Sequence, residues 1–253
     1  MSGEFEGPRT AIVTGGARRI GAALCRALAE DGWHLLIHCL NSRVEAEALA
    51  AELGNASVVA ADLASPACAE EIFAALDGLP PPKLLVNNAS RFAFDSADAF
   101  TPEEWDAHLD TNLRAPALLS RAFAEEAEAE GGLIVNLLDS KLANPNPDFF
   151  SYTISKTGLA GLTEITARAF AARGIRVCGI APSVTLVSGA QSSENFEVVH
   201  GLNALGRGVE VDQIVAALRF LVCTATITGQ TITLDGGQRF MGLARDIQFL
   251  EPQ

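Results

Sequence analysis

The chain has few cysteines and lacks a long apolar run. Its five cysteines are odd in number and widely spaced, with no Cys-x-x-Cys pair, a pattern typical of reduced thiols in a cytoplasmic protein. No uninterrupted apolar stretch reaches the roughly 20 residues of a membrane-spanning helix. The segment from Met1 to Thr10 lacks the charged start and the apolar core of a signal peptide. We therefore expect a cytoplasmic protein with no membrane partner, no metal site and a flexible segment over residues 1–9.

Basic residues are also scarce. The chain carries 18 Lys and Arg against 31 Asp and Glu, a formal net charge of -13. Binding to a phosphate backbone or to anionic lipid needs a positive face, so nucleic acid is not an expected partner. An anionic cofactor would have to be captured by local charge against the overall field, which gives weight to Arg18, Arg19 and Arg43.

Short β-branched runs alternate along the chain with longer segments whose apolar residues recur at helical spacing. The predicted strands are Thr10–Thr14, His34–Cys39, Ser57–Ala60, Leu84–Asn87, Leu133–Leu138, Ile175–Ala181 and Thr231–Leu234. The predicted helices are Ile20–Glu30, Val44–Leu53, Pro66–Leu76, Glu103–Glu128, Tyr152–Ala172 and Asp212–Val222. This alternation predicts an α/β fold, a single doubly wound Rossmann-type domain over residues 1–253 with a seven-stranded parallel sheet and helices on both faces.

Two stretches between these elements carry their own signals. Thr101-Pro102-Glu103-Glu104 combines a capping box with a proline at the first helical position, which predicts a helix start. Residues 186–208 form the only long stretch without a clear period, and they follow the sixth predicted strand. Long loops at the carboxyl ends of parallel strands commonly cover a ligand, so we expect residues 186–208 to act as a substrate lid.

The first predicted strand runs directly into a glycine-rich turn and then a helix. The turn reads Thr14-Gly15-Gly16-Ala17-Arg18-Arg19-Ile20-Gly21. Glycines let the backbone approach a pyrophosphate closely, and the first N–H groups of the helix face it. The pattern Thr-Gly-x-x-x-x-x-Gly resembles the fingerprint of the short-chain dehydrogenase/reductase family, with Arg19 where the family usually has a middle glycine. The turn is similar to that of the pteridine and dihydromonapterin reductases of this family, in which a basic residue here reaches the cofactor or the substrate.

The end of the second predicted strand indicates NADPH as the cofactor. An acidic residue there would bind the ribose hydroxyls of NAD, but the segment reads His38-Cys39-Leu40-Asn41-Ser42-Arg43. A 2'-phosphate could instead bind Asn41, Ser42 and the nearby arginines, although Ser42 could also cap the following helix. With the glycine turn, the resemblance implies a set of further cofactor contacts: Gly15, Arg18, Arg19, Ile20, Gly21, Asp62, Leu63, Asn88, Ala89, Ser90, Pro182, Val184 and Thr185.

Tyr152 is the only tyrosine, and Lys156 lies four residues later, so both side chains project from one face of a helix. A nearby ammonium lowers the pKa of a tyrosine hydroxyl, which would make proton exchange with a substrate feasible near neutrality. This Tyr-x-x-x-Lys pair resembles the catalytic signature of the family, in which both residues also contact the cofactor. Asn112 matches the fourth catalytic position, where asparagine helps to hold a water on the lysine. Alternatively, Asn112 tolerates a backbone carbonyl that Pro116, lacking an N–H, leaves free.

The third catalytic position departs from the usual pattern. The family usually has serine thirteen residues before the tyrosine, and here that residue is Asp139. An ionised carboxylate would repel a ketone oxygen. Together with Tyr152 and Lys156, however, it can pass a proton to a ring nitrogen as hydride reaches the adjacent carbon. Pteridine reductases carry aspartate here, and Phe92 matches the residue that holds the pterin against the nicotinamide, unless it is plain core. Arg19, Phe92 and Asp139 are therefore the predicted substrate residues.

These residues predict an NADPH-dependent oxidoreductase that transfers hydride to a pterin-like C=N bond. A carbonyl reductase or alcohol dehydrogenase, in which Ser140 or Ser90 polarises a ketone, is the first alternative. A non-catalytic NADPH-binding sensor is the second, although a pure binder has no need of the full catalytic set. Members of the family usually form homodimers or homotetramers through two long helices. Gly158 and Gly161 would permit such close helix approach, and packing within the chain would explain them equally well.

Overall fold

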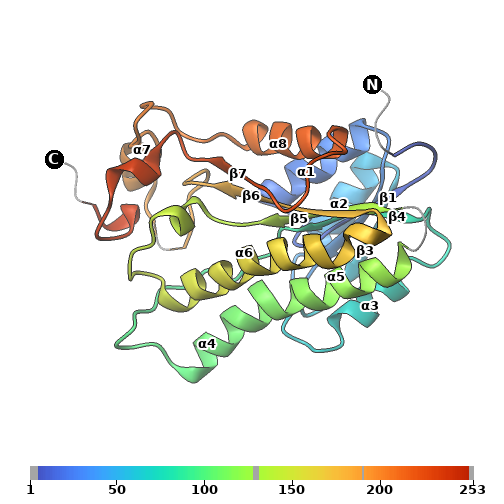
Figure 1. Cartoon of the computed structure of the whole chain (residues 1–253), viewed down its shortest axis with the longest axis horizontal. Helices are drawn as coiled ribbons and strands as arrows, with labels where there is room; N and C mark the ends of the chain where they lie inside the picture. Colours follow the sequence, from blue (N-terminus) through green and yellow to red (C-terminus); the bar gives the residue numbers. More distant parts are fainter. Residues whose placement is uncertain (1–4, 128–130, 190, 251–253) are drawn as a thin grey trace.

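The computed structural model describes residues 5–127, 131–189 and 191–250 (Figure 1). Seven strands pair in parallel in one sheet, in the order β3-β2-β1-β4-β5-β6-β7. They are β1 (Thr10–Val13), β2 (His34–Cys39), β3 (Ala56–Ala60), β4 (Pro82–Asn87), β5 (Gly132–Leu137), β6 (Ile175–Pro182) and β7 (Thr231–Leu234). This order confirms the predicted doubly wound sheet. The direction of winding reverses between β1 and β4, and ligands of such sheets bind beyond the carboxyl ends of the strands at that point.

Helices cover both faces of the sheet (Figure 1). One face carries α1 (Arg19–Glu30), α2 (Arg43–Leu53) and α8 (Val211–Cys223). The other face carries α3 (Cys68–Ala74), α5 (Ala115–Glu126) and α6 (Phe150–Phe170). The remaining elements are α4 (Pro102–Leu109), α7 (Ser193–His200), the π-helix η1 (Asp110–Arg114) and four 3-10 turns, η2 (Ser140–Ala143), η3 (Ala171–Arg173), η4 (Gln238–Met241) and η5 (Ile247–Phe249).

Burial explains why the central strands read as continuous apolar runs. Every residue of β1, β4 and β5 is buried, because helices cover both faces of the sheet there.

The five cysteines are free thiols, four of them buried. No helix among the described residues is both long enough and apolar enough to cross a membrane.

The helix predicted over Glu103–Glu128 is wrong as a single element. It is divided into α4, η1 and α5, and Pro116 lies at the start of α5. Proline has no N–H, so Pro116 cannot donate to the carbonyl of Asn112 four residues earlier, and the wider π-helical turn accommodates this loss. At the start of α4 the Thr101 hydroxyl accepts from the Glu104 N–H at 3.2 Å, as predicted. The Glu104 carboxylate binds the Arg91 guanidinium instead of completing the capping box.

Two other predicted segments differ from the observed ones, and the flexibility expected of residues 1–9 stays a prediction. Residues 186–208, expected to be irregular, contain α7, which Ser192 caps by accepting a hydrogen bond from the Asn195 N–H at 3.1 Å. The helix predicted from Pro66 begins at Cys68. Within the segment expected to be flexible, residues 1–4 lie outside the described residues, whereas Phe5 and Arg9 both pack against the ring of Trp33.

Candidate active site

A cavity of about 280 Å³ opens beyond the carboxyl ends of the central strands. It lies where the reversal of winding is expected to place a ligand. Eleven of the residues predicted from sequence line it: Arg19, Ile20, Asn88, Ser90, Phe92, Asp139, Tyr152, Lys156, Pro182, Val184 and Thr185. The fold therefore brings together residues that lie up to 166 positions apart in the chain (Arg19 to Thr185).

Asp139 and Tyr152 are in direct contact in this cavity. The Tyr152 hydroxyl donates to Asp139 Oδ2 at 2.7 Å, and the backbone N–H of Lys141 donates to Asp139 Oδ1 at 2.8 Å. Asp139 follows β5 and caps η2, and Tyr152 lies in the first turn of α6. The neighbouring Ser140 is buried and lines the same cavity, but it is Asp139 that touches the tyrosine.

The expected acidification of Tyr152 is wrong for this arrangement. Burial and the adjacent charge of Asp139 raise the pKa of Tyr152 well above its usual value. Burial also raises the pKa of Asp139, against the opposing effect of its two hydrogen bonds. The pair therefore consists of a neutral phenol and a carboxyl that resists ionisation, and such a pair retains protons.

Lys156 lies on the same face of α6 but binds elsewhere. Its ammonium donates to the Leu137 carbonyl at 2.7 Å and lies 5.8 Å from the centre of the Tyr152 ring. Burial lowers the pKa of Lys156 to about 8. The lysine is thus placed against the end of β5, and it loses its charge at a lower pH than an exposed lysine does.

Asn112 is buried in η1 and does not line the cavity. Its side-chain oxygen accepts from the Arg91 N–H at 2.8 Å, and its amide group donates to the Arg91 carbonyl at 2.9 Å and to the Ser155 hydroxyl at 3.0 Å. The asparagine therefore fastens the segment after β4 to η1 and α6. Asn112 lies four residues before Pro116, so its backbone carbonyl is the one that receives no hydrogen bond from the proline. This is the position that the alternative interpretation of Asn112 requires.

The glycine-rich turn has the geometry of a phosphate cradle. Gly15 has a φ of +61°, and a Cβ on Gly21 would lie 2.2 Å from the Gly15 carbonyl oxygen, so both positions require glycine. No side chain caps the start of α1, which leaves its first N–H groups available to an anion. Arg18 and Arg19 are both exposed beside this helix end. The turn therefore fits the pyrophosphate of a dinucleotide.

Asn88 and His38 hold this turn in place. The Asn88 amide donates to the Thr14 and Gly15 carbonyls at 2.8 and 3.2 Å. The Gly15 N–H donates to His38 Nδ1 at 3.2 Å, and His38 Nε2 lies 3.0 Å from the Ala61 carbonyl. Burial lowers the pKa of His38, which favours the neutral imidazole that can accept at Nδ1. Sequence reasoning missed this role of His38. The only signal for it is that His38 lies near the end of β2, the strand that pairs with β1, which leads into the turn.

The residues predicted to hold the other end of the cofactor follow β2 and β3. Ser42 precedes α2, but its hydroxyl makes no capping hydrogen bond to that helix, so the capping interpretation is wrong. Asp62 is exposed and accepts from the Ala64 N–H at 2.9 Å, and Leu63 beside it is buried. Asn41 and Ser42 therefore lie at the edge where an adenosine phosphate would lie, with no carboxylate at the end of β2.

Phe92 is part of an aromatic cluster at the cavity wall. Its ring stacks on Phe149 with centroids 4.3 Å apart and meets the Tyr152 ring edge-on at 4.8 Å. It also lines the cavity, so it is not plain core. Because Phe149 covers one face of Phe92, a planar ligand could stack only on the other.

Sequence reasoning missed most of the polar residues at the outer end of the cavity. They are Lys141, Asn144, Asn146, Gln238, Arg239, Asp246 and Gln248. They come from the loop between β5 and α6 and from the segment after β7. The alternating Asn and Pro of residues 144–147 is the one signal of an irregular loop directly before the Tyr152 helix.

Comparison with known proteins agrees with this arrangement. A family model described as short chain dehydrogenase matches residues 9–197. The structure of FolM alternative dihydrofolate reductase 1 from Brucella canis, solved with NADP, is 40% identical with a TM-score of 0.87, over 92% of this chain and 94% of that chain. A blue fluorescent protein from a metagenomic library, solved with NADPH, is 31% identical with a TM-score of 0.83, over 90% and 97%. The 3-oxoacyl-(acyl-carrier-protein) reductase FabG of Staphylococcus aureus is 32% identical over 245 residues, 90% of this chain and 97% of the relative.

The family match spans most of the chain, and the structural similarity to FolM covers 92% of it. FolM and FabG are both named reductases. The chain therefore belongs to the short-chain dehydrogenase family, and it is an oxidoreductase of that family.

Proposed function

We propose that this chain is an NADPH-dependent reductase of a pterin-like ring, which adds hydride to a C=N bond. The observation that carries the proposal is the 2.7 Å contact between the Tyr152 hydroxyl and Asp139 in the cavity wall. A carboxyl that resists ionisation can supply a proton to a ring nitrogen, whereas an ionised one would repel a ketone oxygen. The NADP-bound relative at 40% identity is named a dihydrofolate reductase, which supports the same substrate class.

The described residues fit NADPH. The uncapped start of α1 and the turn at Gly15 and Gly21 would hold the pyrophosphate, and Ser42 and Arg18 would hold the 2'-phosphate. The absence of an acidic residue at the end of β2 favours the phosphorylated cofactor. When bound, NADPH supplies the hydride.

The chain itself supplies and places the proton. Tyr152 would donate its hydroxyl proton to the ring nitrogen, and a protonated Asp139 carboxyl could then return a proton to the phenol oxygen that lies 2.7 Å away, which restores the neutral phenol. Lys156 holds the end of β5 through the Leu137 carbonyl and thereby the start of the Asp139 segment. Phe92 lines the cavity beside Tyr152, so a flat ring bound there would contact an aromatic wall.

A substrate panel tests this proposal. NADPH oxidation is measured with dihydropterins, dihydrofolate and simple ketones, and the panel is repeated with NADH. We expect turnover of at least one dihydropterin with NADPH, and we expect Asp139→Ala to slow it by about 100-fold, within the usual range for loss of an acid. The Kd for NADPH should stay within about twofold of the wild type, because Asp139 is not among the residues assigned to the cofactor. Full activity of Asp139→Ala on pterins would contradict the assigned role.

A carbonyl reductase is the second candidate. Ser90 and Ser140 both line the cavity, and several relatives are named 3-oxoacyl reductases. In this case Asp139→Ser should preserve or increase the reduction of a ketone, because a hydroxyl can donate to the carbonyl oxygen.

We also propose that copies of the chain associate through the outer face of α6. Gly158 is explained by packing within the chain, since a Cβ there would lie 2.7 Å from Leu113 Cδ2, but a Cβ on Gly161 would meet no atom within 4 Å. Ile165, on the same helix, is 67% exposed. A homodimer or homotetramer would cover this face of α6. The cytoplasmic location stays a prediction from the sequence.

A further inference from the structure

The segment after β7 closes the outer end of the cavity. Leu243, Asp246, Ile247 and Gln248 all line it, and Asp246 begins η5 by accepting from the Gln248 N–H at 3.2 Å. The backbone N–H of Asp246 donates to Asp148 Oδ2 at 2.7 Å. Asp246 is only 9% exposed, so its carboxylate is held among protein groups.

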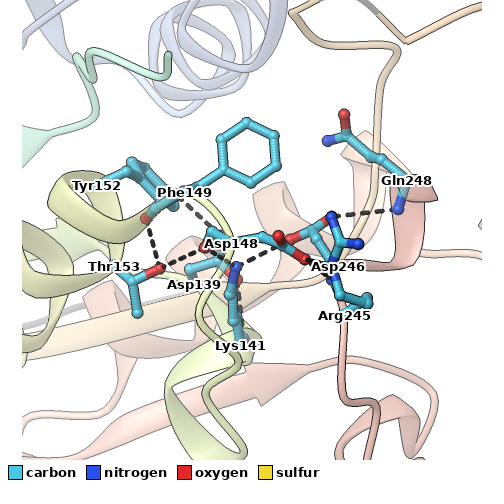
Figure 2. Close-up of polar contacts among 9 residues, drawn as sticks. All are labelled: Asp139, Lys141, Asp148, Phe149, Tyr152, Thr153, Arg245, Asp246 and Gln248. Carbon is cyan, nitrogen blue, oxygen red and sulfur yellow. Dashed lines mark hydrogen bonds and ion pairs between the residues drawn. The ribbon is translucent and has the colours of Figure 1, made fainter. Parts of the chain in front are cut away.

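Lys141 connects this segment to the catalytic pair. Figure 2 shows its ammonium between the loop before α6 and the segment after β7. The ammonium donates to the Asp148 carbonyl at 2.6 Å and to Asp246 Oδ2 at 3.0 Å. The Lys141 side chain is 10% exposed, and a buried cation is stable only where carboxylate and carbonyl oxygens surround it. Asp246 is the one carboxylate within ion-pair distance of it among the described residues.

The same lysine holds Asp139 through its backbone. The Lys141 N–H donates to Asp139 Oδ1, while Tyr152 occupies Oδ2, so each carboxyl oxygen has its own donor. Moving the Lys141 side chain would therefore move the N–H that orients the acid. Two contacts, Asp246 to Lys141 and Lys141 to Asp139, join residues 107 positions apart.

The charges around Asp139 come from three elements. Tyr152 and Lys156 face it from α6, Lys141 belongs to its own segment, and Asp246 faces it from the segment after β7. Arg19 and Arg239 line the same cavity. The negative charge of Asp246 raises the pKa of Asp139, and the positive charge of Lys141 lowers it. The two members of this ion pair therefore act on the acid in opposite directions.

We propose that Asp246 is a positioning residue for proton delivery: it anchors Lys141 and thereby holds Asp139 against Tyr152, which makes the segment after β7 part of the catalytic apparatus. Asp246 acts through Lys141 and need not touch the substrate. The inference rests on the proposed role of Asp139 as the acid, but its physical content, the coupling of two carboxyls, can be measured without any substrate.

The test is a titration of Asp139 by NMR. The protein is labelled with 13C at the aspartate carboxyl carbons, and the Asp139 signal is assigned by its loss in Asp139→Asn. In Asp246→Asn the midpoint of Asp139 should rise, because a released Lys141 no longer holds its N–H on Asp139 Oδ1 and a hydrogen bond that lowers the pKa of Asp139 is lost, whereas removal of the Asp246 charge alone would lower that pKa. The midpoint in the matched control Arg245→Gln should stay at the wild-type value. Arg245 anchors the same segment through Asp148 at 2.7 Å but does not contact Lys141.

The outcomes separate a positioning role from general loosening of the segment. A rise confined to Asp246→Asn supports the proposal, whereas a fall in that variant, equal shifts in both variants, or no shift in either overturns it. If circular dichroism shows that Asp246→Asn does not fold, Asp246→Ser is used, since its hydroxyl can still cap η5. Where the wild type reduces a dihydropterin, the pH profile of that reaction should move to higher pH in the same variant. Failure of the wild type to reduce any pterin would contradict the proposed function. The positioning role of Asp246 would then still be decided by the NMR titration.

Discussion

At the scale of single residues, the chemistry of the site depends on burial more than on the charge of a neighbour. The sequence predicted a tyrosine acidified by Lys156, but the Lys156 ammonium bonds to the Leu137 carbonyl, and the hydroxyl of Tyr152 bonds to Asp139. Spacing along a helix shows which side chains share a face and does not show which hydrogen bonds they choose. The positions of Asp139, Tyr152 and Lys156 could be predicted from sequence, whereas their pKa shifts required the depth of the cavity.

Arg19 offers a test at this scale. Its φ of +54° lies in the left-handed region, where a residue with a side chain is strained and glycine is not. Arg19→Gly should therefore raise the free energy of unfolding by about 1 kcal/mol, as measured by urea denaturation. It should also weaken NADPH binding, because a positive charge at the cavity is lost.

Arg19→Ala is the matched control, since it removes the charge and keeps the Cβ. It should lose the same binding affinity without the gain in stability. Equal stability of the two variants would show that the backbone at Arg19 is not strained.

At the scale of elements, the strands could be predicted most closely. Their buried apolar runs follow directly from a sheet covered on both faces, and six of the seven both begin and end within one residue of the expected bounds. The long helices were harder. Apolar spacing continues through the region of Pro116 without a break, so the sequence pattern did not reveal that η1 separates α4 from α5. The short α7 carries too few apolar residues to produce a helical period.

The start of α6 depends on a residue from another loop. The backbone N–H of Ser151 donates to Asp95 Oδ1 at 3.0 Å, and Tyr152 is the next residue. Asp95→Ala should lower the free energy of unfolding by about 1 kcal/mol, the usual cost of losing a helix cap, and should reduce turnover because the Tyr152 turn is no longer fixed. Asp95→Asn keeps an acceptor oxygen and should restore both properties in urea denaturation and activity assays. If Asp95→Ala is as stable and active as the wild type, the cap does not position Tyr152.

At the scale of the whole molecule, the order of the strands assembles the site from distant segments. The glycine turn, the end of β5 and the start of α6 meet because β1, β4 and β5 are adjacent in the sheet, and that order follows from the doubly wound pattern. The segment after β7 could not be placed in this way. The Lys141–Asp246 ion pair joins residues 105 positions apart, and neither residue belongs to a motif that the sequence made visible.

The central claim is that Asp139 and Tyr152 hold the proton that accompanies hydride transfer. The most direct test is the single-turnover rate of NADPH oxidation by a dihydropterin, measured as a function of pH in the wild type and in Asp139→Asn. Burial raises the pKa of Asp139, so its protonated form is present below that pKa and is lost as the pH rises through it. We predict that the wild-type rate falls with rising pH across this range. Asp139→Asn keeps the size of the side chain and one acceptor oxygen but carries no transferable proton, so it should be about 100-fold slower and should lack this pH dependence. A wild-type rate and an unchanged pH profile in Asp139→Asn would contradict the account.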